Sequence, residues 1–146
     1  MSDTRKALGE INGEGLTYID DIEQIYELVE AFFQERSSLA DEDFVTLFRL
    51  FEEFPNDDCS HVLWDIIHGI EHYGGYEGEM IVSLHKAPSA VPLLLVNRLL
   101  NGGFMEYKGQ NYLSLLEEIA KRTNCPQSIA DRAAGYYKRQ QGKTPP

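Results

Sequence analysis

The sequence predicts an all-α fold, and three observations lead to this prediction. Apolar residues recur at helical spacing along most of the 146-residue chain. No segment shows a sustained two-residue alternation of apolar and polar side chains, which a half-buried strand would require. Glycine or proline follows several of the apolar stretches, where helices are expected to end. The short connections between them predict antiparallel neighbours and about seven helices in total.

The ends of the chain carry no such pattern. Residues 1–15 contain Gly9, Gly13 and Gly15 and lack apolar periodicity, so we expect a mobile N-terminal arm. A single helical domain is predicted over residues 16–141, and residues 142–146 are expected to form a frayed tail.

Two helices are predicted in the first part of the domain. The first begins after Thr17, an N-cap candidate with Asp20 three residues further on. Its apolar stripe consists of Ile19, Ile22, Ile25, Tyr26, Val29, Phe32 and Phe33. The second helix covers residues 41–54, with Asp41 as its cap and Pro55 ending it.

Five further helices are predicted, over residues 60–73, 77–85, 88–100, 110–123 and 126–140. The first of these ends at Gly74 and Gly75, which suit a left-handed C-terminal cap. The helix over 88–100 has proline in its first turn and is apolar almost all round. We therefore expect it to be the central helix of the domain.

A faint internal repeat refines the fold. Residues 50–54 (LFEEF) are followed by a polar turn, Cys59 and a helix, and residues 115–119 (LLEEI) are followed by a polar turn, Cys125 and a helix. Such self-similarity is typical of stacked helical hairpins. We favour a small HEAT-like right-handed array of antiparallel helical hairpins over an irregular bundle.

Negative charge is concentrated in the first sixty residues. This part of the chain has sixteen Asp and Glu against four Lys and Arg, whereas the remaining residues have eight acids against nine bases. A charge confined to one half creates a directional field, which attracts a basic partner and repels nucleic acid and anionic membranes. The alternative is an acidic surface that only interacts with solvent.

The acids are expected to form one partner-binding zone on the first two helices. Four of them lie on the face of the first helix opposite its apolar stripe, at spacings of three and four residues. The others lie on the second helix and the turn after it. The predicted zone consists of Asp20, Glu23, Glu27, Glu30, Glu42, Asp43, Glu52, Glu53, Asp57 and Asp58.

A second candidate is a ridge on the helix over 60–73. His61, Asp65, His68 and His72 are spaced four, three and four residues apart and therefore share one helix face. This ridge could contact a partner, could simply be solvated, or could chelate a metal ion through its imidazoles. We expect no metal, because the ridge faces outward and lacks a shielded third ligand.

The remaining features point to no catalytic chemistry. The sequence has no phosphate-binding glycine loop, no nucleophile elbow and no His-Glu-x-x-His motif, so no enzyme activity and no cofactor are expected. Cys59 and Cys125 are read as reduced thiols of a cytoplasmic protein. The chain shows no secretory signal and no membrane span. The aromatic residues at helix margins, among them Trp64, are expected to pack at the edge of the core, with an anchor in an interface as the alternative.

One part of the chain resembles a known group of proteins. Between residues 80 and 137, the stretch Ala87 to Gly102 contains a proline-opened helix with an Asn-Arg pair, and Tyr112 to Ala120 contains Leu-Leu-Glu-Glu. This order is similar to the helical, HEAT-like immunity families of bacterial polymorphic-toxin and contact-dependent growth-inhibition systems. The resemblance implies a protein that binds the toxic C-terminal domain of a partner, in many cases a basic nuclease, and blocks its active site.

The leading hypothesis is therefore an immunity protein that neutralises a basic toxin domain through an acidic helical surface, without binding nucleic acid or membrane. The main alternative is a helical-repeat adaptor for another basic or peptide partner. A third possibility is a metal-dependent enzyme that uses the residues of the histidine ridge.

Overall fold

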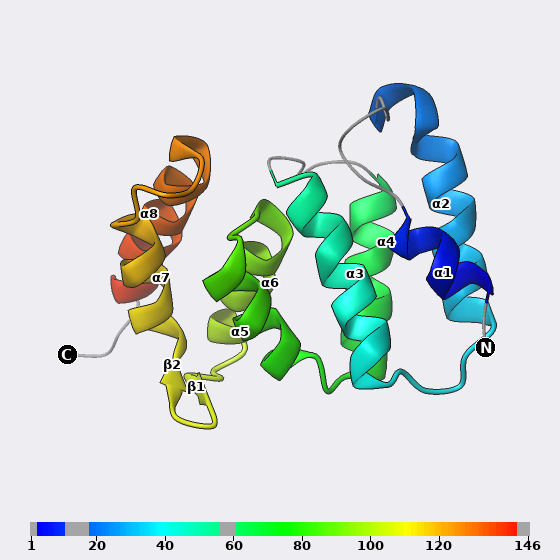
Figure 1. The fold of residues 1–146 in the computed structure, drawn as a ribbon. Coiled ribbons are helices and arrows are strands. Elements are labelled where there is room, and N and C mark those ends of the chain that lie inside the picture. The colour runs from blue at the N-terminus through cyan, green and yellow to red at the C-terminus, as the bar shows by residue number, and fades with distance from the viewer. Residues whose placement is uncertain (1–2, 11–17, 56–60, 143–146) are drawn as a thin grey trace.

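The computed structural model describes residues 3–10, 18–55 and 61–142. These residues form eight helices and one small β-hairpin (Figure 1). In chain order the elements are α1 (Asp3–Gly9), α2 (Tyr18–Gln34), α3 (Asp41–Glu53), α4 (His61–Tyr73), α5 (Glu77–Lys86), α6 (Ala90–Asn101), β1 (Glu106–Tyr107), β2 (Gln110–Asn111), α7 (Tyr112–Ala120) and α8 (Gln127–Gln141). The prediction of an all-α fold is confirmed.

The helices form two layers. In one layer α1 packs against α3, and α3 packs against α5. In the other layer α2 packs against α4, α4 against α6, and α6 against α8. Within the stack, α1 packs on α2, α5 on α6 and α7 on α8. Figure 1 shows the resulting row of helices, which runs from α1 and α2 at one end to α7 and α8 at the other. This alternation between two layers is the arrangement of stacked helical hairpins.

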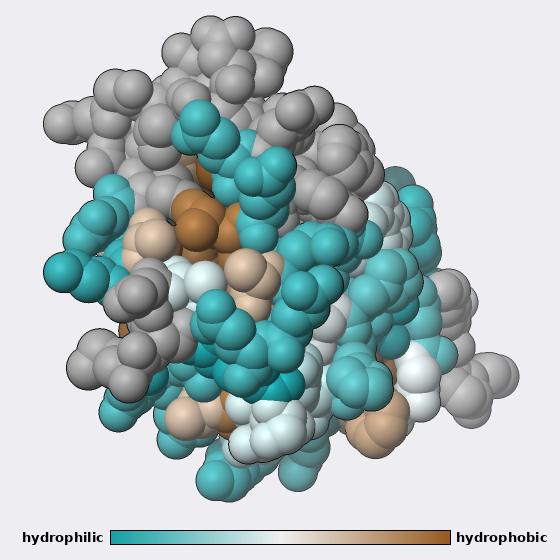
Figure 2. All heavy atoms as spheres, turned by 90° about the vertical axis from the view of Figure 1, so that its right-hand side faces the viewer, coloured by the Kyte–Doolittle hydropathy of each residue, from teal (hydrophilic) through white to brown (hydrophobic). Residues whose placement is uncertain are grey.

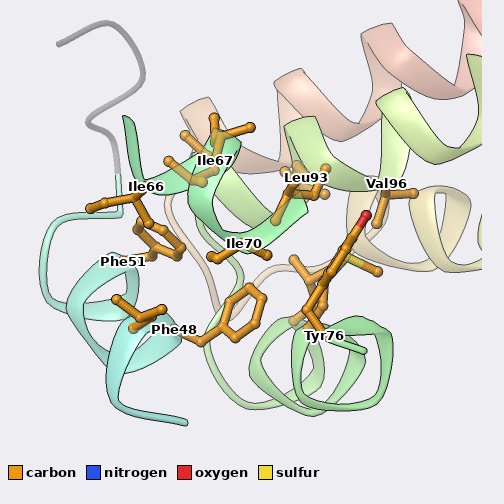
Figure 3. Packing of buried hydrophobic residues seen from close by; sticks show 14 of the residues in the cluster. Phe48, Phe51, Ile66, Ile67, Ile70, Tyr76, Leu93 and Val96 are labelled. Atoms are coloured by element: carbon orange, nitrogen blue, oxygen red, sulfur yellow. The ribbon is translucent and has the colours of Figure 1, made fainter. Parts of the chain in front are cut away.

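The core lies between the layers. Phe48 and Phe51 of α3 and Ile66 and Ile70 of α4 are at most 2% exposed, and Figure 3 shows them close together with Leu93 of α6. Helix α6 buries most of its residues, from Ala90 to Leu100, so its predicted central position is confirmed.

The prediction of a mobile N-terminal arm is wrong for residues 3–10, the part of the arm that the structure describes. Residues Asp3–Gly9 form helix α1, and Leu8 is completely buried against the core. Ala7 and Leu8 give too short an apolar signal to indicate a helix, and it is the contact with α2 and α3 that fixes this segment. Residues 11–17, including the predicted cap Thr17, and the predicted tail beyond residue 142 lie outside the described residues.

Several helix boundaries also differ from the prediction. Helix α3 begins at Asp41. The backbone N–H of the preceding residue, Ala40, donates to Asp43 Oδ2 at 3.0 Å, so the carboxylate that caps this helix end is that of Asp43 and not, as predicted, that of Asp41. Helix α6 begins at Ala90, which places Pro92 in its first turn. Gly74 and Gly75 have φ values of +71° and +76°, as the predicted left-handed cap requires.

The β-hairpin was not predicted. Glu106 pairs with Asn111 and Tyr107 with Gln110, and the turn residues Lys108 and Gly109 have φ values of +47° and +88°. Two consecutive positive φ values are typical of a tight hairpin turn. Strands of two residues are too short to show an alternating pattern in the sequence. Within the described residues, none of the helices has the length and apolarity that crossing a bilayer demands.

Candidate protein-binding surface on helices α2 and α4

Helices α2 and α4 lie side by side and run in the same direction (Figure 1). The Phe33 ring stacks on Tyr73 with ring centroids 5.9 Å apart and also covers Gly69. The Tyr73 hydroxyl donates to the backbone oxygen of Arg36 at 2.6 Å or of Phe33 at 3.0 Å. These contacts fix the C-terminal end of α2 against the last turns of α4, and so determine which residues of the two helices lie at the same level.

This register joins two features that the sequence suggested separately. Counting back from Phe33 and its contacts, Glu27 lies near the level of Asp65, and Glu30 near that of His68. Glu27, Glu30, His68 and His72 are exposed, and Asp65 is partly exposed. The described acids of α2 and the described residues of the histidine ridge are therefore exposed, fully or in part, on two adjacent helices at similar levels along their axes. We call this set the α2–α4 surface, consisting of Glu27, Glu30, Trp64, Asp65, His68 and His72.

Three of the predicted site residues lie on these helices with only their backbone described. Asp20 and Glu23 lie in α2 and His61 begins α4, while their side chains are outside the described set. Asp57 and Asp58 are also outside the described residues. Figure 2 shows that hydrophilic side chains cover most of the described surface at the α1–α2 end of the molecule, around an apolar patch.

Asp43 was predicted to belong to the acidic partner-binding zone, and this prediction is wrong because its side chain is buried and has a structural role. Its side chain is 8% exposed, and Oδ1 lies 3.4 Å from Arg36 Nε and 3.5 Å from Arg5 Nη1. Arg36 also donates to the backbone oxygen of Phe32 at 2.7 Å and lies over the Phe32 ring at 3.8 Å. Asp43 thus neutralises charges at the junction of α1, α2 and α3, and it is not available to a partner.

Glu52 corrects the zone in the same way. Its side chain is 12% exposed, lies 3.3 Å from Lys86 Nζ and accepts a hydrogen bond of 2.7 Å from Ser83. These contacts hold α3 against α5. Glu42 is exposed but forms an ion pair of 2.9 Å with Arg5, and Glu53 is partly exposed.

The predicted single zone over the first two helices is therefore divided. Helix α2 packs against α1 and α4, whereas α3 packs against α1, α5 and α6, so their carboxylates belong to different layers. Of the acids of α3, Glu42, Asp43 and Glu52 are engaged with arginine or lysine, whereas the described acids of α2, Glu27 and Glu30, are exposed.

Two ion pairs engage half of the basic residues in the first sixty. Arg5 and Arg36 are two of the four basic residues in the first sixty, and they are occupied by Glu42 and Asp43. Setting these two pairs aside leaves fourteen acids and two bases in this half of the sequence, so its net charge stays at −12. Arg36 is 11% exposed on its side chain, so it contributes little to neutralising the outer face of α2.

The described side chains contain no group of three His, Cys, Asp or Glu residues placed to hold a metal ion. Asp65, His68 and His72 consequently do not form a three-ligand site by themselves. The ring contacts of these histidines are aromatic: His68 lies 5.9 Å from Trp64, and His72 packs edge-on against Tyr73 at 5.3 Å. Cys125 is a partly exposed free thiol.

Trp64 is more exposed than the favoured prediction from the sequence. It was expected at the edge of the core, but it is 40% exposed. The helical spacing indicates this exposure, since Trp64 shares a helix face with the polar residues His68 and Glu71 and not with Ile66 and Ile70.

Comparisons of the chain with protein-family models, with curated proteins and with solved structures find no match. The function of the α2–α4 surface therefore has to be inferred from its own charge and exposure.

Proposed function

We propose that this protein binds a basic protein partner through the α2–α4 surface, and that the partner is the toxic C-terminal domain of a bacterial toxin, which it neutralises in the cytoplasm. The observation that carries the proposal is the exposure of Glu27 and Glu30, with the partly exposed Asp65 on the adjacent parallel helix, while Arg5 and Arg36 are held in ion pairs elsewhere.

The charge of this surface suits a toxin that acts on nucleic acid. A nuclease needs cationic side chains to bind phosphates. An acidic surface on two rigid helices attracts those cations, accelerates association and blocks access to the natural anionic substrate. The same field disfavours nucleic acid and anionic membrane as partners of this protein.

Binding to the C-terminal domain encoded immediately upstream of this gene tests the proposal. Kinetic measurements at low and moderate salt should give a tight complex whose association rate falls as salt increases. The double variant Glu27→Lys/Glu30→Lys should weaken binding at low salt by about 100-fold, mainly through the association rate. If the double variant binds as tightly as the unchanged protein, this surface is not the site.

A matched control separates local from overall charge. Glu106→Lys/Asp131→Lys makes the same change in net charge at exposed positions of the β-hairpin and α8. We expect this variant to keep most of its affinity. An equal loss in both double variants would mean that net charge, and not the α2–α4 surface, governs binding.

The adaptor alternative is supported by the two-layer stack, since stacked helical hairpins present extended surfaces to other proteins. Growth of cells that express the upstream toxin domain separates the two functions. Co-expression of this protein should restore growth if it is an immunity protein. Continued growth arrest, together with binding to a different basic protein, would support the adaptor.

A further inference from the structure

His72 lies beside the contact that joins α4 to α2. The Phe33 ring of α2 covers Gly69 of α4. Residues three or four apart share a helix face, so His72, three residues after Gly69, and Asp65, four before it, flank this contact. Glu30, three residues before Phe33, flanks it on α2 in the same way. Because His72 and Glu30 are both exposed, they lie on the solvent side of the contact, about one helical turn from it.

His68 extends this group along α4, on the side away from α2. Its ring lies 5.9 Å from that of Trp64, and the Arg98 guanidinium of α6 lies 5.8 Å from the Trp64 ring centroid on a cation–π contact. Glu71 accepts two hydrogen bonds of 2.8 Å from that guanidinium. The charge of Arg98 is therefore balanced where α6 approaches the histidines.

The remaining charged groups near the two imidazoles are acidic. Helix α4 packs against α2 and α6. Among the described side chains, α2 contributes Glu27 and Glu30, and α4 itself contributes Asp65. Arg36 follows the end of α2, and its guanidinium lies 3.4 Å from the buried Asp43. The only charges that can change sign balance on this surface near neutral pH are thus those of the histidines.

Protonation of the histidines would oppose the field that attracts a basic partner. Histidine is the side chain whose charge ordinarily changes between about pH 5 and 8, whereas Asp and Glu stay mostly ionised there. Two imidazolium charges would offset most of the field of the three nearby carboxylates. They would also repel an approaching lysine or arginine directly.

We propose that pH regulates the binding of the basic partner at the α2–α4 surface through His72 and His68. The partner binds strongly while both imidazoles are neutral and weakly once they are protonated. The inference rests on the proposed function and adds a regulation of the same surface. By linkage, the affinity falls as the pH falls, because the partner and the protons are cations that bind to one field.

Calorimetry with a hexa-arginine peptide tests the inference, since arginine stays charged over the whole range. In low salt, the unchanged protein should bind the peptide about tenfold more weakly at about pH 5.5 than at about pH 7.5. His68→Gln/His72→Gln should lose most of this difference. His85→Gln is the control and should keep it, because His85 is also exposed but lies on α5, 3.6 Å from Glu118.

A fixed charge tests the same inference without acid. His68→Lys/His72→Lys should bind the peptide at about pH 7.5 as weakly as the unchanged protein does at about pH 5.5. If it binds as tightly as the unchanged protein at the higher pH, the regulation is wrong. Circular dichroism at both pH values verifies that each variant is folded.

The possible results separate this inference from the proposed function. If Glu27→Gln/Glu30→Gln weakens binding, but the affinity is independent of pH or the glutamine variant of both histidines keeps the full pH dependence, the regulation is wrong and the acidic surface stands. If the peptide does not bind at either pH, or if Glu27→Gln/Glu30→Gln leaves its affinity unchanged, the proposed binding surface fails and the regulation fails with it.

Discussion

The Phe33 ring occupies the space that a side chain on residue 69 would need. A Cβ atom added to Gly69 would lie 2.5 Å from Phe33 Cζ, closer than real Cβ contacts allow. The ring has little freedom to move away, because it stacks on Tyr73 and meets Phe32 edge-on at 5.6 Å. Gly69 therefore permits the close approach of α2 and α4 on which the α2–α4 surface depends.

In Gly69→Ala the overpacking of this contact should cost about 1–3 kcal/mol, so the net destabilisation should be up to about 2 kcal/mol once the helix propensity of alanine is counted. Chemical denaturation measures this change. Alanine is favoured over glycine within a helix by about 1 kcal/mol, so the observed value is the overpacking cost less this gain.

Gly135→Ala provides the matched control. Gly135 also lies within a helix, α8, but a Cβ atom there would have no neighbour within 4 Å. This variant should gain up to about 1 kcal/mol from helix propensity alone. If Gly69→Ala gains as much stability as Gly135→Ala, the contact with Phe33 does not limit the approach of the two helices.

Asp43→Asn should destabilise the protein by about 3 kcal/mol, because it removes the carboxylate that compensates the largely buried Arg36. Thermal and urea unfolding measure the effect. Asp41→Asn, in the same first turn but exposed, should change the free energy of unfolding by less than about 1 kcal/mol. Similar small losses in both variants would contradict the structural role assigned to Asp43.

Gln140→Ala should loosen the contact between α6 and α8. The Gln140 side chain is buried, and its amide donates to Asn97 Oδ1 at 2.6 Å and to Asn101 Oδ1 at 2.8 Å. Its loss leaves a buried acceptor on Asn97 without this donor, at a cost of about 1–3 kcal/mol. The neighbouring exposed position serves as control, since Gln141→Ala should leave stability nearly unchanged. Hydrogen exchange in α8 should accelerate in the first variant and not in the second.

Stability should decline at alkaline pH because of buried tyrosine. Burial, followed by the nearby Glu77 carboxylate and Tyr107, raises the pKa of Tyr112 from 10.0 to about 12. The folded state therefore binds more protons than the unfolded state between these values, and stability falls as the pH rises. The stabilisation is complete below pH 10 and is lost as the pH approaches about 12, with a total of about 2–3 kcal/mol.

Denaturation curves recorded across this pH range measure the effect. In Tyr112→Phe the decline above pH 10 should be smaller by about this amount. Tyr76 continues to contribute in the variant, because burial also raises its pKa. Parallel curves for the two proteins would show that Tyr112 does not contribute to the pH dependence.

The helical spacing of the sequence predicted much of the site on α4. Asp65, His68 and His72 were placed on one face because residues three and four apart are neighbours on any helix. The same rule could not tell that Asp43 and Glu52 are withdrawn from the surface. Their partners, Arg36 and Lys86, belong to other helices, and such contacts leave no periodic signal.

The sequence by itself determined the all-α fold, the central position of the helix that begins at Ala90 and the excess of acid in the first sixty residues. These properties follow from local spacing and composition. Only the tertiary structure decided that α2 lies parallel to α4, that helix α1 forms around the buried Leu8, and that Trp64 remains exposed beside Arg98. Each of these depends on contacts between residues far apart in the chain, where packing outweighs the preference of any single segment.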